Sequence, residues 1–113
     1  MDTKAVIEHH IDALEAGDLE RTLSDYTEDS VILSGGVVYR GLESLRALFG
    51  GAIEGLFAPG AHTFTLTSLA VDGPYGIIEW TLDFPGGSIT FGTDTFHIVD
   101  GKVAMQTGAF VMG

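Results

Sequence analysis

One stretch near the C-terminal end limits the fold most tightly, because its apolar residues alternate as in a strand and then change phase. Ile89 and Phe91 share one face, whereas beyond Gly92 the apolar positions are Phe96 and Ile98. A change of phase at a glycine within a strand indicates a β-bulge, and bulges bend the strand that carries them. The chain is therefore expected to contain a curved sheet.

The same stretch, Ser88–Val99, holds an acid on its apolar side. Counting back by twos from Phe96 places Asp94 on the inner face of the strand. Burying a carboxylate is costly unless the group is paired or has a chemical task. Asp94 is therefore the first candidate for a functional residue.

The rest of the second half also has the pattern of strands joined by short turns. The expected strands are His62–Val71, Tyr75–Phe84 and Val103–Met112, with turns at Asp72–Pro74, Pro85–Gly87 and Asp100–Gly101. The first of them also changes phase, from Phe64 and Leu66 to Leu69 and Val71. Long strands with such short connections form an antiparallel meander.

The first half of the chain has helical periodicity, interrupted by a hairpin. The expected elements are helices over Thr3–Ala16, from Asp18 onward and from Leu42 to about Leu56, with a hairpin of Ser30–Leu33 and Val37–Tyr39 around Gly35-Gly36. Gly50-Gly51 leaves open whether the third helix is continuous. Three helices packed in a curved, mostly antiparallel sheet make an α+β fold with a conical interior, which suits a small hydrophobic ligand.

Size and charge exclude several classes of protein. The 113 residues suit one domain, 1–113, and an apolar content of 45% excludes a disordered chain. A net charge of −11 argues against nucleic acid and against anionic membrane surfaces. The chain has no cysteine, no recognisable signal peptide and no apolar run of membrane-spanning length. We expect a cytoplasmic protein without disulfides.

His10 is the second candidate for catalysis, because it lies on the apolar face of the first helix while His9 does not. A neutral imidazole can take a proton near pH 7, and a buried carboxylate such as Asp94 can orient it. The alternative is a core histidine hydrogen-bonded to a buried acid, with no ligand.

Five further residues are expected to line a ligand pocket: Tyr26, Ser34, Tyr39, Phe49 and Trp80. Core packing or a place on the hairpin surface is the alternative for each of them. His62 and His97 are interpreted as surface or interface residues. No metal site and no cofactor are expected, because His9 and His10 point different ways and no glycine-rich loop opens a helix.

The order of elements resembles the nuclear transport factor 2-like superfamily, the cystatin-like cone that includes SnoaL-like cyclases and ketosteroid isomerases. The resemblance covers nearly the whole chain and is carried by AGDLERTLSDYTEDSVIL (Ala16–Leu33), Tyr39-Arg40-Gly41 and FGTDTFHIVDGKV (Phe91–Val103). The resemblance implies a fold more than a function, because one scaffold of this kind hosts unrelated chemistries.

Against the ketosteroid isomerases the match is partial. The resemblance places His10 where those enzymes have an inward tyrosine, and Ser34 where they have the general base. Only Asp94 occupies a position similar to one of their catalytic groups, an inward aspartate on a late strand. Steroid isomerisation by their mechanism is therefore not expected here.

Three functions remain open at this stage. The chain is interpreted first as a cofactor-independent isomerase, cyclase or lyase in which His10 is the acid–base group and Asp94 its partner. The alternatives are a non-catalytic module that binds a hydrophobic ligand and a dimeric interaction domain with a filled core. Apolar residues on the outer sheet face, namely Ile77, Val99, Val103 and Met105, together with the resemblance, predict a homodimer packed sheet to sheet.

Overall fold

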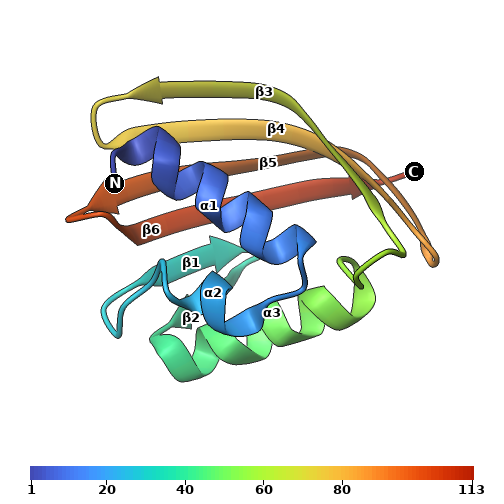
Figure 1. Ribbon diagram of the computed structural model, residues 1–113, viewed down its shortest axis with the longest axis horizontal. Coiled ribbons are helices and arrows are strands. Elements are labelled where there is room, and N and C mark those ends of the chain that lie inside the picture. Colours follow the sequence, from blue (N-terminus) through green and yellow to red (C-terminus); the bar gives the residue numbers. More distant parts are fainter.

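The computed structural model describes all 113 residues, and its elements follow the expected order (Figure 1). The helices are α1 (Thr3–Glu15), α2 (Leu19–Leu23) and α3 (Leu42–Gly55). The strands are β1 (Val31–Ser34), β2 (Val37–Arg40), β3 (Thr63–Asp72), β4 (Tyr75–Phe84), β5 (Gly87–Val99) and β6 (Lys102–Met112). The α+β fold predicted from the sequence is confirmed.

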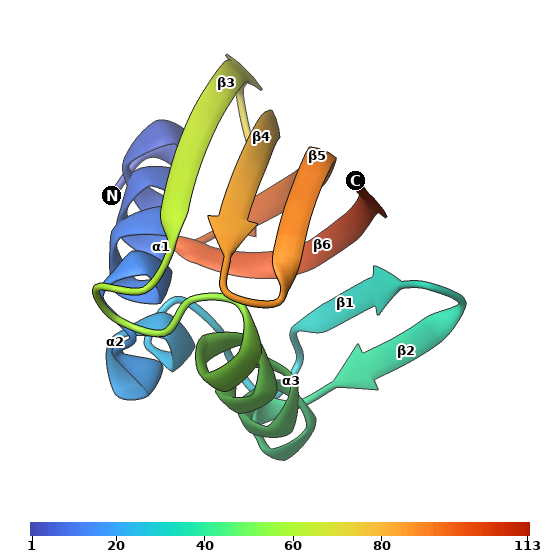
Figure 2. The same cartoon turned by 90° about the vertical axis from the view of Figure 1, so that its right-hand side faces the viewer.

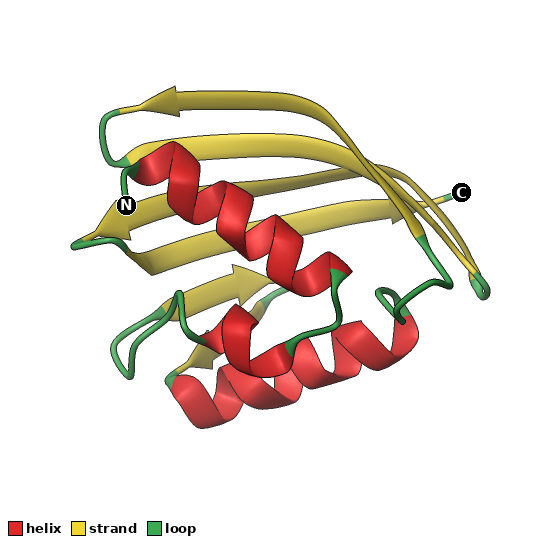
Figure 3. Cartoon of the chain, in the orientation of Figure 1, coloured by secondary structure: helices red, strands yellow, loops and turns green.

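All six strands form one mixed sheet in the order β2-β1-β6-β5-β4-β3 (Figure 3). Strands β3 to β6 make an antiparallel meander. The hairpin of β1 and β2 joins the same sheet, because β1 pairs in parallel with β6. The hairpin therefore extends the sheet beneath α3 and completes one wall of the interior.

The sheet bends around α1 and α3, as Figure 2 shows. In β5 the register shifts near the predicted position, between Ile89 and Gly92, against both neighbouring strands. The one extra residue of β5 places Phe91 on the outer face, where it is 45% exposed. The expected shared face of Ile89 and Phe91 is therefore wrong, although the bulge itself is confirmed. A second predicted shift, in β3, lies between Leu66 and Ser68.

A third bulge was not predicted, and it changes the face of one residue. In β6 the register shifts at Ala104, so that Val103 pairs with Ile98 and Gln106 with Phe96. Val103 is consequently buried in the core rather than exposed on the outer face. The same shift turns Gln106 inward, where it is 3% exposed.

The helix ends agree with the capping pattern of the sequence. The Asp2 side chain accepts a hydrogen bond from the backbone of Ala5, and Asp18 does the same for Arg21. Between the two helices, Gly17 adopts a left-handed conformation with φ of 66°, which favours glycine. Helix α3 is continuous through Gly50-Gly51, which answers the question left open by the sequence.

No helix of this fold is long and apolar enough to cross a membrane. The hydrophobic core is formed by one side of α1, the inner side of α3 and the concave face of the sheet. Its largest fully buried side chains include Phe96, Ile7 and Leu45. These residues fix the helices over the sheet and leave a space between them.

Candidate functional site

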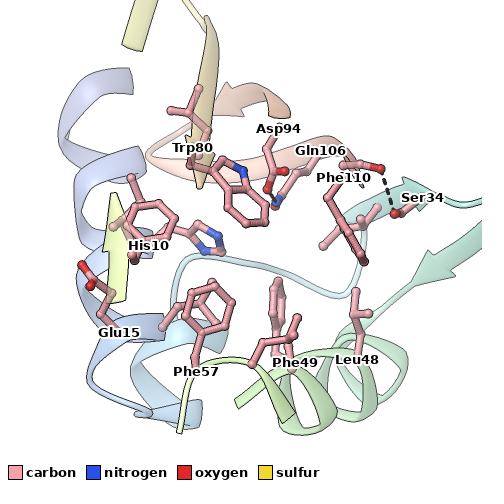
Figure 4. A pocket seen from close by; sticks show the side chains of 18 of the residues that line it. His10, Glu15, Ser34, Leu48, Phe49, Phe57, Trp80, Asp94, Gln106 and Phe110 are labelled. Atoms are coloured by element: carbon pink, nitrogen blue, oxygen red, sulfur yellow. Dashed lines mark hydrogen bonds between the residues drawn. The ribbon is translucent and has the colours of Figure 1, made fainter. Parts of the chain in front are cut away.

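A cavity of about 170 Å³ lies between α1, α3 and the concave face of the sheet. Most of its wall is apolar and includes five aromatic side chains, Phe49, Phe57, Phe64, Trp80 and Phe110. Figure 4 shows three polar side chains, His10, Asp94 and Gln106, across the cavity from Phe49 and Phe57. An apolar pocket with a few converging polar groups is the usual form of a small-molecule site.

Five of the seven residues predicted for the site lie on this wall: His10, Ser34, Phe49, Trp80 and Asp94. Tyr26 and Tyr39 do not. The Tyr26 side chain is buried behind the wall, and its hydroxyl group is bonded to Gln106. Tyr39 lies on the edge strand β2 and packs against the core. Their expected places in the lining are therefore wrong.

Asp94 is a carboxylate without a cation. Its Oδ2 accepts a hydrogen bond from Gln106 Nε2 at 3.0 Å, and no lysine or arginine lines the cavity. Burial raises the pKa of Asp94 to about 6, against the opposing effects of Gln106 and Trp80. The absence of a side chain at Gly108 makes room for this carboxyl, since a Cβ there would lie 3.3 Å from Oδ1. Asp94 is therefore poised to exchange a proton near neutral pH.

His10 faces the same cavity in its neutral form. The residue is 2% exposed, and its ring meets the rings of Tyr26, Phe49 and Phe96 edge-on at centroid distances of 5.9, 5.7 and 5.6 Å. Burial, and then the charge of His9, lower the pKa of His10 to about 4. The imidazole is thus held firmly and stays uncharged near pH 7.

A chain of three hydrogen bonds joins the two candidate catalytic residues, which do not bond directly. His10 Nδ1 lies 3.3 Å from the Tyr26 hydroxyl oxygen. The Tyr26 hydroxyl donates to Gln106 Oε1, and Gln106 Nε2 donates to Asp94. Burial raises the pKa of Tyr26 well above its ordinary value, so its hydroxyl keeps its proton. The direct pair expected from the sequence is therefore replaced by a relay through Tyr26 and Gln106.

Gln106 is the relay residue that sequence reasoning missed, and Glu15 is a further polar residue of the wall that it did not name. Simple alternation from the start of β6 does not show that Val103 and Gln106 both face inward. Only the bulge at Ala104 permits it, and no glycine marks that bulge. A usable signal was the amide itself, since a glutamine within an apolar strand needs a buried partner.

A second imidazole–carboxylate pair lies outside the cavity lining. His9 Nδ1 contacts both carboxyl oxygens of Asp25, at 2.9 and 2.8 Å, and Asp25 is 2% exposed. Burial raises the pKa of Asp25, while the bond and charge of His9 act in the opposite direction. This pair ties α1 to the segment after α2.

The two remaining histidines differ from each other. His97 stacks on Tyr75 on the outer side of the sheet, as predicted for a surface residue. The side chain of His62 is 5% exposed, so its predicted surface position is wrong. Its Nδ1 lies 2.9 Å from the carbonyl oxygen of Ala58, and its ring packs against Phe57. No group of three or more His, Asp or Glu side chains is arranged to hold a metal ion.

Comparison with known families agrees with this architecture. The model of the SnoaL-like domain matches residues 7–106, and the chain belongs to this family. A search for similar sequences among curated proteins finds no match.

Solved structures of low sequence identity share the fold. A Kribbella flavida protein provisionally named a ketosteroid isomerase superposes with a TM-score of 0.81 at 20% identity, over 98% of this chain and 78% of that one. A Sinorhizobium meliloti protein provisionally named a polyketide cyclase gives 0.77 at 19%, over 93% and 94%. A Methylobium petroleophilum protein of unknown function, described as having a cystatin-like fold, gives 0.78 at 17%, over 96% and 75%. The expected cystatin-like fold is confirmed.

Proposed function

We propose that the chain is a cofactor-independent enzyme of the isomerase, cyclase or lyase type that acts on a hydrophobic small molecule in this cavity. One observation carries the proposal: the Asp94 carboxylate, with no cation beside it, on a wall that is otherwise largely apolar. The names of two structural neighbours, a ketosteroid isomerase and a polyketide cyclase, belong to the same broad class.

In this proposal Asp94 moves the proton. A carboxylate whose pKa is about 6 is ionised at pH 7, accepts a proton from the ligand and can return it to another ligand atom. His10, with a pKa of about 4, is the weaker base and positions the ligand. This assignment reverses the roles expected from the sequence.

The alternative function is binding of a hydrophobic ligand without turnover, and one residue lets both be tested. Trp80 is the only tryptophan and lies on the cavity wall, so its fluorescence reports directly on the site. A library of hydrophobic compounds is screened by Trp80 emission, and the compounds that bind are then assayed for conversion by mass spectrometry. Conversion that is lost in Asp94→Asn supports the enzyme. Binding with no conversion of any compound favours the binding module, and no binding at all contradicts both.

We further propose a homodimer formed through the outer face of the sheet. Four apolar side chains from β4, β5 and β6 are exposed there: Ile77 40%, Phe91 45%, Val99 45% and Val111 57%. Phe91 and Val111 are direct cross-strand neighbours, and exposed apolar patches often mark an interface. Sedimentation velocity is expected to show a dimer that Phe91→Lys converts to a monomer, whereas Val71→Lys, on the concave face of the edge strand β3, leaves it intact. A monomeric native chain contradicts this proposal.

A further inference from the structure

Three side chains of the cavity wall that can donate hydrogen bonds, Ser34, Gln106 and Trp80, each direct a donor toward a group of the protein. Ser34 donates its hydroxyl proton to the carbonyl oxygen of Gly108 at 2.8 Å. Gln106 donates from Nε2 to Asp94, and the Trp80 indole, which can only donate, interacts with the same carboxylate. Apart from His10, no other lining side chain carries a donor. Whether His10 donates or accepts a hydrogen bond therefore determines which polar groups of a ligand this part of the wall can bind.

The direction of the hydrogen-bond relay fixes the proton on His10. An ionised Asp94 only accepts, so the amide nitrogen of Gln106 faces it and the amide oxygen faces Tyr26. That oxygen also only accepts, so the Tyr26 proton points toward Gln106. The Tyr26 oxygen then has only lone pairs left for His10, and Nδ1 of His10 carries the imidazole proton.

The other ring nitrogen of His10, Nε2, is consequently a bare acceptor. Nε2 has no hydrogen-bond partner in the protein. Every side-chain nitrogen or oxygen that is sealed from solvent does have such a partner. Nε2 is therefore reachable, and the space beside His10 is the cavity that its ring lines. The resting wall presents Nε2 of His10 and the carboxylate of Asp94 as neighbouring acceptors, and a second carboxylate, Glu15, lines the same cavity.

We infer that the ligand is a hydrophobic alcohol, phenol or amine that presents hydrogen-bond donors to His10 and Asp94 and carries no negative charge. The inference rests on the proposed function and names its substrate class. A carbonyl or ether oxygen brought to these groups would meet only acceptors, which leaves polar atoms unpaired on both sides. An anion would meet the carboxylates of Asp94 and Glu15, with no lysine or arginine on the wall to offset them.

The first experiment reads the His10 proton in the free protein. The chain labelled with ¹⁵N in its histidines is studied by long-range ¹H–¹⁵N correlation at pH 8, where Asp94 is ionised. The expected result is a neutral His10 protonated on Nδ1. A neutral His10 protonated on Nε2 overturns the inference without touching the proposal that the cavity binds and converts a ligand.

The second experiment compares three probes that share one ring system: 2-naphthol, 2-methoxynaphthalene and 2-naphthoate. Calorimetry at pH 8 is expected to show 2-naphthol binding at least tenfold more tightly than either of the others. Equal or tighter binding of the ether or the carboxylate overturns the inference, while binding as such still supports a hydrophobic-ligand site. Failure of all three to bind overturns the proposed function together with the ligand class.

A pair of tyrosine variants separates the relay from general packing. Tyr26→Phe removes the acceptor for Nδ1 of His10, so it is expected to shift His10 toward the Nε2-protonated form and to reduce the preference for 2-naphthol at least threefold. Tyr39→Phe, a change outside the wall and the relay, leaves both readouts unchanged. An unaltered His10 spectrum in a folded Tyr26→Phe chain contradicts the relay. If Tyr26→Phe does not fold, the ¹H–¹⁵N spectrum of His10 in the native chain tests the relay.

Discussion

Two carboxylates near histidines, the buried Asp25 and the half-buried Asp94, lie in different surroundings. Asp25 meets His9 directly, through both of its oxygens, and lies away from the cavity. Asp94 reaches His10 only through Gln106 and Tyr26, and it lines the cavity. Burial raises the pKa of both acids, but only Asp25 has an imidazole in contact to act against that rise.

A raised pKa is therefore not enough to identify a site. Asp25 satisfies its charge locally and stabilises the contact between two helical segments, because its partner is part of the protein. Asp94 has only neutral donors as partners and lines the cavity, so in the proposed function its further partner is the ligand. Access to a cavity, rather than burial, makes Asp94 and not Asp25 the candidate functional acid.

The largest expected difference between the two acids is in turnover. Once a substrate is identified, Asp94→Asn is expected to lower kcat by roughly 10³-fold, because it removes the proton acceptor while keeping the shape of the side chain. Asp25→Asn is the matched control and is expected to retain kcat within about threefold, since Asp25 does not line the cavity. Steady-state kinetics of both variants test this, and equal losses in the two would contradict the distinction.

The free energy of unfolding is expected to rise in Asp94→Asn, whereas kcat falls. The folded pKa of Asp94, about 6, lies above the ordinary value of 3.8, so ionisation destabilises the fold as pH rises from about 4 to about 6, and the effect persists above pH 6. Two units of pKa correspond to roughly 3 kcal/mol. Asp94→Asn is therefore expected to raise the free energy of unfolding at pH 8 by about 2 kcal/mol, with little change at pH 4. Urea denaturation at both pH values measures it, and a loss of stability at pH 8 would sink the idea.

The His9–Asp25 pair should respond to the loss of either partner. His9→Ala leaves a buried carboxylate without its hydrogen-bond donor, which is expected to cost about 1.5 kcal/mol at pH 7. Adding Asp25→Asn is expected to recover part of that loss, because the remaining group is then neutral. Chemical denaturation of the single and double variants gives the coupling energy. Simple additivity would show that the pair does not act as a unit.

The inner face of Asp94 and the curvature of the sheet could be predicted, because strand alternation and a glycine at a phase change are local signals. The position of Val103 could not, because the bulge at Ala104 has no glycine and depends on pairing with β5. Gln106 was missed for the same reason. Asp25 was missed because its burial comes from the approach of α1 in the folded chain, which no spacing in its own segment encodes.

Placement of the aromatic residues shows the same limit. Trp80 and Phe49 lie on elements with clear periodicity, and both line the cavity as expected. Tyr26 lies beyond the end of α2, and a partner on β6, far away in the sequence, takes its hydroxyl group. Alternation gives the face of a residue, whereas its partner on that face is decided by tertiary contacts.

One measurement tests the contrast between the two acids most directly: a ¹³C NMR titration of the aspartate side-chain carboxyls, with and without a saturating hydrophobic ligand from the Trp80 screen. The account predicts that Asp94 titrates near pH 6 in the free protein and that its midpoint moves when the ligand binds. Asp25 should show the same titration in both samples. An Asp94 that titrates near pH 4, or that ignores the ligand while Asp25 responds, would contradict the account.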